Sequence, residues 1–183
     1  PHHITGKTIT VTSVINLAVA LPETIVALDN VYGEFQTDRM SEFMHEVVRS
    51  HPNILVCRSF SKAHALLGLR VGYGIGHPAL IAKIRSKIVP YSINSIAQVA
   101  AAESLRDTEN VNHNVDLNEP AKHMTYKLLH TLGISYVPTQ SSALLINFGS
   151  RAEGVAKLCK QRGVKCRDEK KCEIPGHIQV HLI

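Results

Sequence analysis

Three short apolar runs, separated by helical patterns, constrain the fold of this chain more than any other feature. One helical pattern, Thr10–Ala20, precedes the first run, and another, Ser41–Ser50 with Ser41 as its N-cap, joins the first run to the second. Because strands that alternate with helices are usually joined by crossovers, the sequence predicts an α/β fold with a mostly parallel sheet. The predicted strands are Thr24–Asp29, Asn53–Ser59 and Arg70–Gly76.

The second half of the chain continues the alternation on a smaller scale. Pro78 is predicted to begin one helix, and Ser95–Leu105 to form another. The polar, asparagine-rich stretch 107–118 marks a boundary, so we expect residues 1–112 to be the C-terminal part of a large domain and residues 113–183 to be a small, incomplete C-terminal α/β domain. Its expected elements are a helix at Glu119–Leu132, a strand at Ser142–Phe148, a helix at Arg151–Arg162 and a strand near Ile178.

Composition and charge restrict the class of protein. The 183 residues are 44% hydrophobic, and no run approaches the roughly 18 apolar residues of a membrane span, so we expect a cytoplasmic globular protein. The net charge of +5 comes from scattered Lys and Arg, which argues against nucleic-acid binding. The chain begins at Pro1 without Met and stops after a strand, and we expect a longer protein that has lost its N-terminal part.

The cysteines do not form a recognisable ligand pattern. They share no CxxC spacing and are too few for a disulfide scaffold, so the sequence favours free thiols, and we expect no metal site. The four residues are Cys57, Cys159, Cys166 and Cys172.

The sharpest signal is the run 59–73, SFSKAHALLGLRVGY, directly after an apolar strand. A turn at a strand end presents its side chains at the carboxyl edge of the sheet, where open α/β folds bind ligands. The hydroxyls of Ser59 and Ser61 and the guanidinium of Arg70, beside Lys62, suit a phosphate group. On the residues alone, a solvated loop with ordinary cations is an equal alternative.

This run resembles the S-[FL]-[SA]-K-x(5)-G-x-R-x-G pattern of the class I and II aminotransferases, with Lys62 eight residues before Arg70. Upstream, the run 26–35, VALDNVYGEF, resembles the apolar strand and D-E-A-Y-x-E-F motif of the same family. The resemblance implies the fold type I architecture of these pyridoxal-phosphate (PLP) enzymes. It implies that Lys62 is catalytic and binds the cofactor covalently. The other implied cofactor ligands are Ser59, Ser61 and Arg70 at the phosphate, Asp29 at the pyridine nitrogen and Tyr32 at the ring hydroxyl.

One further segment indicates a subfamily of these enzymes, and three residues differ from the family's motifs. Residues 89–98, VPYSINSIAQ, resemble the P-Y-N-V-N-S-L-A-Q stretch of histidinol-phosphate aminotransferases and threonine-phosphate decarboxylases. This implies that Tyr91 and Asn94 line the substrate side, although the start of a helix is an equal alternative. In the other motifs, His3 replaces an asparagine that binds the ring hydroxyl, Gln179 replaces the arginine that holds the substrate carboxylate, and Ser142 replaces an asparagine.

The implied function is a PLP-dependent transaminase, most like histidinol-phosphate:2-oxoglutarate aminotransferase of histidine biosynthesis. Its partners would be small-molecule amines and keto acids and a second subunit in a homodimer, without nucleic acid or membrane. A lyase like threonine-phosphate decarboxylase and a truncated, non-catalytic paralogue are the alternatives. The resemblance also implies that these residues alone are inactive.

Overall fold

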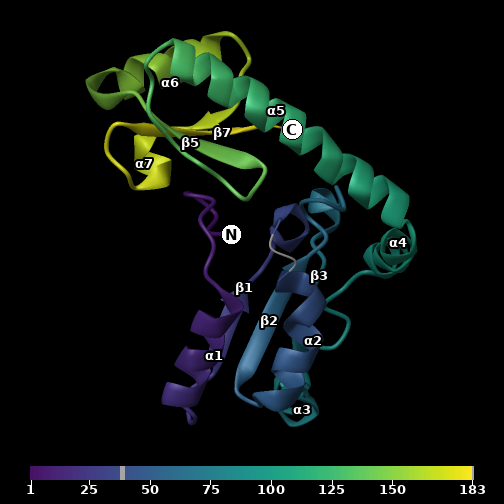
Figure 1. Cartoon of the computed structure of the whole chain (residues 1–183). Coiled ribbons are helices and arrows are strands. Elements are labelled where there is room, and N and C mark those ends of the chain that lie inside the picture. Colours follow the sequence, from purple (N-terminus) through teal and green to yellow (C-terminus); the bar gives the residue numbers. More distant parts are fainter. Residues whose placement is uncertain (38–39, 183) are drawn as a thin grey trace. The chain divides into compact units, whose positions relative to one another are not determined.

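A computed structural model of the chain describes residues 1–37 and 40–182, without the side chains of residues 40–43 (Figure 1). The chain forms two compact units, one of Ile9–Asn114 and the other of Pro1–Thr8 with Val115–Ile183. Within the described residues, no helix combines the length and apolar character needed to cross a membrane.

The larger unit is built on a sheet of strands β1 (Val26–Asp29), β2 (Ile54–Ser59) and β3 (Gly72–Gly76), in that order. Its core lies between this sheet and two helices, where Val14, Ala18, Val47 and Val48 pack against Ile54 and Val56. The first helix begins where the Thr10 hydroxyl accepts a hydrogen bond from the Ser13 N–H at 3.1 Å. The helices of this unit are α1 (Val11–Ala20), α2 (Met40–Ser50), α3 (Pro78–Arg85) and α4 (Ser95–Arg106), and the 3₁₀ turns are Gly33–Phe35 and Leu67–Leu69.

The predicted elements of this unit are confirmed, but one strand direction is not. β1 and β2 are parallel, as predicted, whereas β3 runs antiparallel to β2. The connection from Ser59 to Gly72 contains only a 3₁₀ turn, and without a crossover helix the chain returns as an antiparallel neighbour. β3 begins at Gly72 rather than Arg70, since Arg70 has a left-handed backbone (φ 54°). The predicted N-cap side chain of Ser41 lies outside the described residues.

A single helix, α5 (Thr108–Thr131), runs through the predicted boundary at residues 107–118, and the two compact units divide within this helix, between Asn114 and Val115. The Asp107 carboxylate accepts a hydrogen bond from the Asn110 N–H at 3.1 Å, and Val111 is buried. The polar side chains of this stretch also have structural contacts: Asn114 donates to the Ala63 carbonyl at 2.8 Å, and Asn118 is fully buried. The polar composition of this stretch predicted a domain boundary, and tertiary contacts stabilise it as a helix.

The smaller unit contains an antiparallel sheet of order β4-β5-β7-β6. Figure 1 shows α5 and α6 over one face of this sheet and α7 on the other. Accordingly, Leu144 and Ile146 pack against Leu129 of α5, while Leu145 packs with Cys172 of α7. The predicted β5, α6 and β7 are confirmed, whereas the short β4, β6 and α7 were not foreseen. The elements are β4 (Tyr136–Val137), β5 (Ala143–Asn147), α6 (Ala152–Gln161), β6 (Cys166–Arg167), α7 (Glu169–Cys172) and β7 (His177–His181).

The N-terminal segment Pro1–Thr8 belongs to the smaller unit. The sequence analysis had assigned this segment to the large domain. Ile4 is buried against Leu145 and Cys172, and the Gly6 carbonyl accepts a hydrogen bond from the Gln140 N–H at 2.9 Å. These contacts join residues far apart in the chain, which is why local patterns did not predict them.

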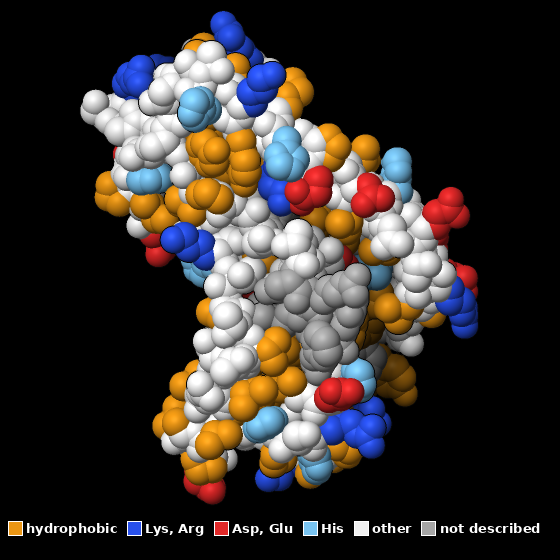
Figure 2. Space-filling view, in the orientation of Figure 1, with side chains coloured by type: hydrophobic (Ala, Val, Ile, Leu, Met, Phe, Trp, Pro, Cys, Tyr) orange, Lys and Arg blue, Asp and Glu red, His pale blue; other side chains and the backbone are white. Residues whose placement is uncertain are grey.

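The outer side of α1 is apolar and exposed. Figure 2 shows hydrophobic side chains gathered over α1 in the lower part of the view. Exposed apolar patches of this kind mark protein or membrane contacts or ligand-binding grooves. The exposed apolar residues on and beside this helix are Ile9, Leu17, Val19, Leu21 and Ile25.

Candidate functional site

The directions of the three strands bring the predicted cofactor residues other than His3 to one edge of the larger sheet. Because β1 and β2 are parallel, their last residues, Asp29 and Ser59, lie at the same edge. Gly72 at the start of the antiparallel β3 pairs with Ser59, so the loop containing Lys62 and Arg70 begins and ends at this edge as well. The structure therefore gathers residues from separate parts of the sequence where open sheets bind ligands.

Lys62 lies in a fixed turn with its amine directed at an aromatic ring. Lys62 is half-buried, and its neighbours along the chain Phe60 and Ala63 are buried. The Lys62 carbonyl accepts a hydrogen bond from the Ala65 N–H at 2.8 Å, and Ala65 has a left-handed backbone (φ 56°). The Nζ atom lies 5.0 Å from the ring centroid of Tyr32, within the range of a cation–π interaction. The loop thus fixes the position of the only lysine in the motif.

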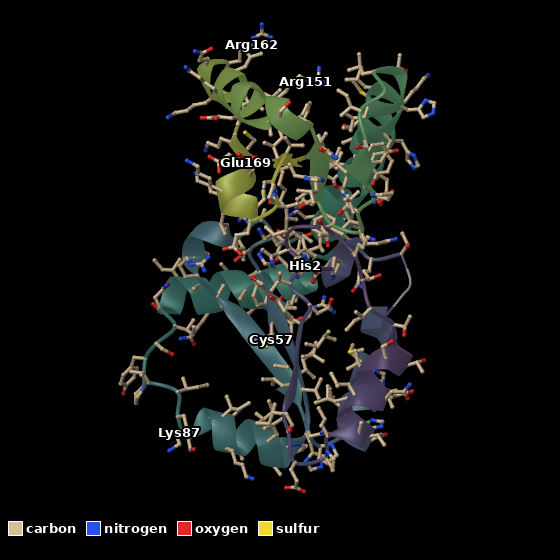
Figure 3. The ribbon with its side chains drawn as sticks, turned by 90° about the vertical axis from the view of Figure 1, so that its left-hand side faces the viewer. His2, Cys57, Lys87, Arg151, Arg162 and Glu169 are labelled. Atoms are coloured by element: carbon tan, nitrogen blue, oxygen red, sulfur yellow. The ribbon has the colours of Figure 1, made fainter. Side chains whose placement is uncertain are left out.

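The serine and aspartate side chains of the motifs have local hydrogen bonds. Ser59 Oγ accepts from the Ser61 N–H at 3.0 Å, and Asp29 Oδ1 accepts from the Val31 N–H at 3.2 Å. Asp29 is exposed, and it pairs with Cys57 of the neighbouring strand. Figure 3 labels Cys57 on this sheet. Burial, and then the negative charge of Asp29, raise the pKa of the Cys57 thiol.

Arg70 presents an exposed guanidinium at the end of the same loop. Its Nη1 donates to the Leu67 carbonyl at 2.9 Å. A guanidinium has five N–H donors in a planar fork, and this bond uses one of them. The other N–H donors of Arg70 suit phosphate oxygens.

A buried ionic cluster beneath the Lys62 loop escaped the sequence analysis. Glu34 Oε1 lies 2.5 Å from Arg58 Nη2 and 3.5 Å from His64 Nε2, and His64 Nδ1 is 2.7 Å from the Ser104 hydroxyl. The side chains of Arg58, Glu34 and His64 are 11, 13 and 7% exposed. The cluster connects the 3₁₀ turn after β1, the end of β2, the Lys62 loop and α4. In the sequence, only Arg58 within an apolar strand pointed to this cluster.

The two predicted substrate residues of the larger unit differ in their surroundings. Asn94 Oδ1 accepts a hydrogen bond from the Ala97 N–H at 2.8 Å and is the N-cap of α4. This contact supports the alternative that residues 89–98 start a helix. Tyr91 is 100% exposed and has a left-handed backbone (φ 59°). A substrate role for either residue remains a prediction.

Gln179 and His3 belong to the smaller unit, where they are hydrogen-bonded to each other. Gln179 is 1% exposed, and its Nε2 donates to the carbonyls of His3 and Ile4 at 2.6 and 2.9 Å. In this arrangement the amide joins β7 to the N-terminal segment. The third departure, Ser142, is buried at the start of β5.

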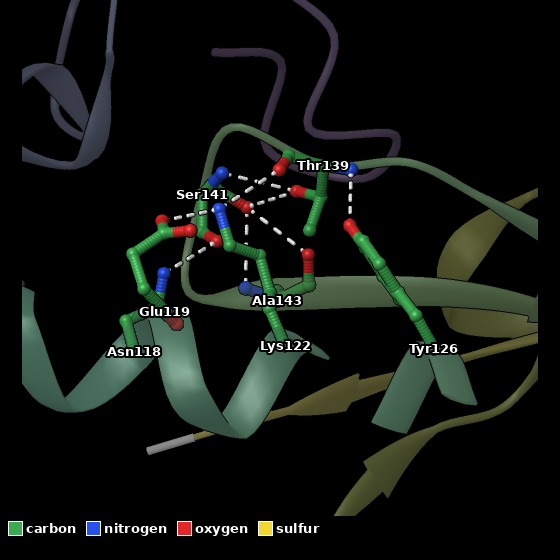
Figure 4. A network of polar contacts seen from close by, with 7 residues as sticks. All are labelled: Asn118, Glu119, Lys122, Tyr126, Thr139, Ser141 and Ala143. Atoms are coloured by element: carbon green, nitrogen blue, oxygen red, sulfur yellow. Dashed lines mark hydrogen bonds and ion pairs between the residues drawn. The ribbon is translucent and has the colours of Figure 1, made fainter. Parts of the chain in front are cut away.

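A polar network holds the turn that precedes β5 (Figure 4). Lys122 is 5% exposed, its Nζ donates to the Thr139 carbonyl at 3.3 Å, and it lies 2.5 Å from the Glu119 carboxylate. The Tyr126 hydroxyl accepts from the Thr139 N–H at 2.9 Å. A Cβ on Gly6, whose φ is 65°, would overlap the Thr139 hydroxyl, so the N-terminal segment approaches this turn closely. The network therefore supports the segment that carries His3.

Comparisons with known proteins agree on one family. The family model described as aminotransferase class I and II matches residues 1–182. Histidinol-phosphate aminotransferase 2 of Ralstonia nicotianae is 38% identical over 142 residues, which are 78% of this chain and 38% of that relative. The curated relatives that the chain matches are thus about twice its length or more.

Solved structures confirm the predicted fold. Histidinol-phosphate aminotransferase from Sinorhizobium meliloti in complex with pyridoxal-5′-phosphate has a TM-score of 0.84 and 22% identity, covering 98% of this chain and 50% of that one. L-threonine-O-3-phosphate decarboxylase from Porphyromonas gingivalis has a TM-score of 0.83 and 20% identity, with coverage of 99% and 57%. At these identities the structures establish the fold alone.

Proposed function

The chain belongs to the class I and II aminotransferase family, and we propose that the whole protein is a PLP-dependent transaminase in which Lys62 holds the cofactor. The observation that carries this proposal is the gathering of motif residues at one sheet edge. They come from the ends of β1 and β2 and from the loop before β3. The proposed cofactor residues are Asp29, Tyr32, Ser59, Ser61, Lys62 and Arg70 of the larger unit, with His3 of the smaller unit.

The chemistry of this edge fits pyridoxal phosphate. A half-buried primary amine suits the aldehyde, and the exposed guanidinium of Arg70 beside the two serine hydroxyls suits the phosphate. The exposed carboxylate of Asp29 suits a protonated pyridine nitrogen. Each part of the cofactor thus has a side chain of matching charge or reactivity at this edge.

The mechanism follows from these roles. When bound, the cofactor supplies an electron sink for the carbanion formed at the substrate α-carbon. Lys62 would hold the cofactor through its Nζ atom, and its amine, once free, would act as the base that removes the substrate α-proton and as the acid that returns a proton. Asp29 would hold the pyridine nitrogen in its protonated form, in which the ring best accepts negative charge. Tyr32, whose ring centroid lies 5.0 Å from Nζ, would orient the cofactor ring, and the two serines and Arg70 would hold its phosphate.

We propose histidinol phosphate as the amine and 2-oxoglutarate as the keto acid. The relative from Ralstonia nicotianae, which bears the name histidinol-phosphate aminotransferase, supports this choice. Decarboxylation of a phosphorylated amino acid is the second candidate, and the resemblance of residues 89–98 to threonine-phosphate decarboxylases supports it. We further propose a cytoplasmic homodimer, which the exposed apolar surface over α1 supports.

Borohydride reduction of the full-length protein with its cofactor, followed by peptide mapping, tests the role of Lys62. We expect a phosphopyridoxyl group on Lys62, and the same treatment of a Lys62→Ala variant should leave the exposed Lys87 unmodified. A stable group on any other lysine would refute the assignment.

Substrate assays then separate the candidate reactions. Glutamate formation from 2-oxoglutarate should accompany consumption of histidinol phosphate by the transaminase, whereas the lyase would release carbon dioxide from threonine phosphate. A protein that retains the cofactor but performs neither reaction would support the non-catalytic paralogue.

A further inference from the structure

The turn that carries Lys62 is anchored by two helices that lie much further along the chain. Asn114 of α5 donates from Nδ2 to the Ala63 carbonyl at 2.8 Å. His64 Nδ1 lies 2.7 Å from the Ser104 hydroxyl of α4. The two residues that follow Lys62 are therefore each held by a side chain from outside the turn.

Both of these anchored residues are buried. Ala63 is 0% exposed and His64 is 7% exposed. The His64 ring also packs against Phe60, with 4.8 Å between the ring centroids. A buried polar group that loses its partner has little water to replace it, so these hydrogen bonds are costly to break.

The backbone of the turn depends on such contacts. The Lys62 carbonyl accepts a hydrogen bond from the Ala65 N–H at 2.8 Å, which places Ala65 in a left-handed conformation (φ 56°). A residue other than glycine adopts this conformation at a cost, and it persists only where the surrounding structure holds it. The contacts of Asn114 and Ser104 supply this support.

We propose that Asn114 and Ser104 are positioning residues of Lys62. They hold the turn from which the Lys62 amine extends to a point 5.0 Å from the ring centroid of Tyr32. The inference rests on the proposed role of Lys62 and deepens it, because it assigns the placement of the reacting amine to side chains of α4 and α5. Placement matters because a displacement of about 1 Å in a reacting group can cost about a hundredfold in rate.

Asn114→Asp in the full-length protein removes the donor to Ala63 and keeps the size of the side chain. Asn53→Asp is the matched control. Asn53 Nδ2 also donates to backbone carbonyls of the same unit, those of Ala18 and Leu21, at 2.9 and 3.1 Å. It directly precedes β2, whose other end leads into the Lys62 turn, so the control loses similar hydrogen bonds away from that turn.

The first measurement needs no turnover. In the cofactor-free full-length protein, dilute acetic anhydride labels Lys62, and mass spectrometry compares the rate with that of the exposed Lys87. A loosened turn exposes the half-buried Lys62 more often, so Asn114→Asp and Ser104→Ala should raise the relative rate about two- to tenfold, the factor of one lost hydrogen bond. Unchanged labelling of Lys62 in these two variants, or an equal rise in Asn53→Asp, would overturn the proposal.

The second measurement separates positioning from loss of the site. In the enzyme with its cofactor, Asn114→Asp should lower kcat about ten- to a hundredfold and leave the KM of the amine substrate nearly unchanged. A raised KM at unchanged kcat would contradict a positioning role. If Asn114→Asp does not fold by circular dichroism, Ser104→Ala, which removes a single hydroxyl, decides both measurements.

Failure of this proposal can be distinguished from failure of the proposed function. Absence of a phosphopyridoxyl group on Lys62 after borohydride reduction would refute the cofactor role of Lys62. The labelling rates in the cofactor-free protein would still decide whether Asn114 and Ser104 hold the turn.

Discussion

Replacing Glu34 by glutamine tests whether the buried ionic cluster stabilises the Lys62 loop. The substitution keeps the volume of the side chain and removes its charge. It leaves Arg58, 11% exposed, without the carboxylate that lies 2.5 Å from its Nη2. Arg58 Nε is already a buried donor without a hydrogen-bond partner among the described residues, so the guanidinium has little to replace the lost charge.

The expected effect is large. Removing one partner of a buried pair destabilises a protein by about 3–5 kcal/mol, and because glutamine still accepts one hydrogen bond we expect the lower end, about 3 kcal/mol. Urea unfolding of the full-length protein measures this loss as a lower midpoint at unchanged slope. Binding of the cofactor, followed by its absorbance, should weaken as well, because Glu34 also faces His64 in the loop that carries Lys62.

Glu103→Gln is the matched control. Glu103 also lies 2.5 Å from an arginine, Arg106, but the two side chains are 67 and 73% exposed. An exposed pair contributes about 0–1 kcal/mol, so this variant should unfold nearly as the wild type does. If both variants lose the same small free energy of unfolding, burial does not strengthen the Glu34–Arg58 pair and the reasoning is wrong.

Three further predictions concern single side chains. Asp29→Asn in the full-length protein should keep most cofactor binding, measured by absorbance, but lose most turnover. The phosphate contacts anchor the cofactor, whereas the carboxylate keeps its ring nitrogen protonated. Unchanged turnover would contradict this role. Lys122→Met should lower the free energy of unfolding by about 1–3 kcal/mol, because it removes a buried donor to Thr139 and the partner of Glu119. Lys87→Met, at an exposed site, should leave the free energy of unfolding unchanged. Because Asp29 raises the pKa of Cys57, Asp29→Asn should lower that pKa and speed alkylation of Cys57 by iodoacetamide at fixed pH; a slower reaction would reverse the sign of the argument.

The sequence predicted those parts of the molecule that depend on local patterns. Apolar runs located β1, β2 and β5, and the motif around Lys62 lies in the turn where a strand-end site was expected. These features succeed because a strand, a cap or a turn is decided within a few residues. The predicted direction of β3 was wrong because the direction depends on whether the preceding connection contains a helix, and the loop between Ser59 and Gly72 contains only a 3₁₀ turn.

Contacts between distant residues explain the other failures. The polar stretch in α5 is helical because Asn114 and Asn118 bond to carbonyls of Ala63 and Ser141, respectively 51 and 23 residues away in the chain. The Glu34–Arg58 pair joins positions 24 residues apart, in segments that read separately as a motif and a strand. Only the folded chain shows these contacts between polar groups that are far apart in the sequence.

Gln179 shows how a departure from a family motif acquires a structural meaning. The sequence marks it as a neutral residue where the resemblance implies an arginine, which points to weak binding of a substrate carboxylate. In the structure its amide hydrogens are already donated to the carbonyls of His3 and Ile4, and it is 1% exposed. The Gln179 amide can donate to a substrate carboxylate only by giving up these two buried hydrogen bonds, at a cost of about 1–3 kcal/mol for each acceptor left unpaired. Gln179 therefore contributes to the position of His3 through the backbone, and the proposed keto-acid substrate would need a cation from another residue.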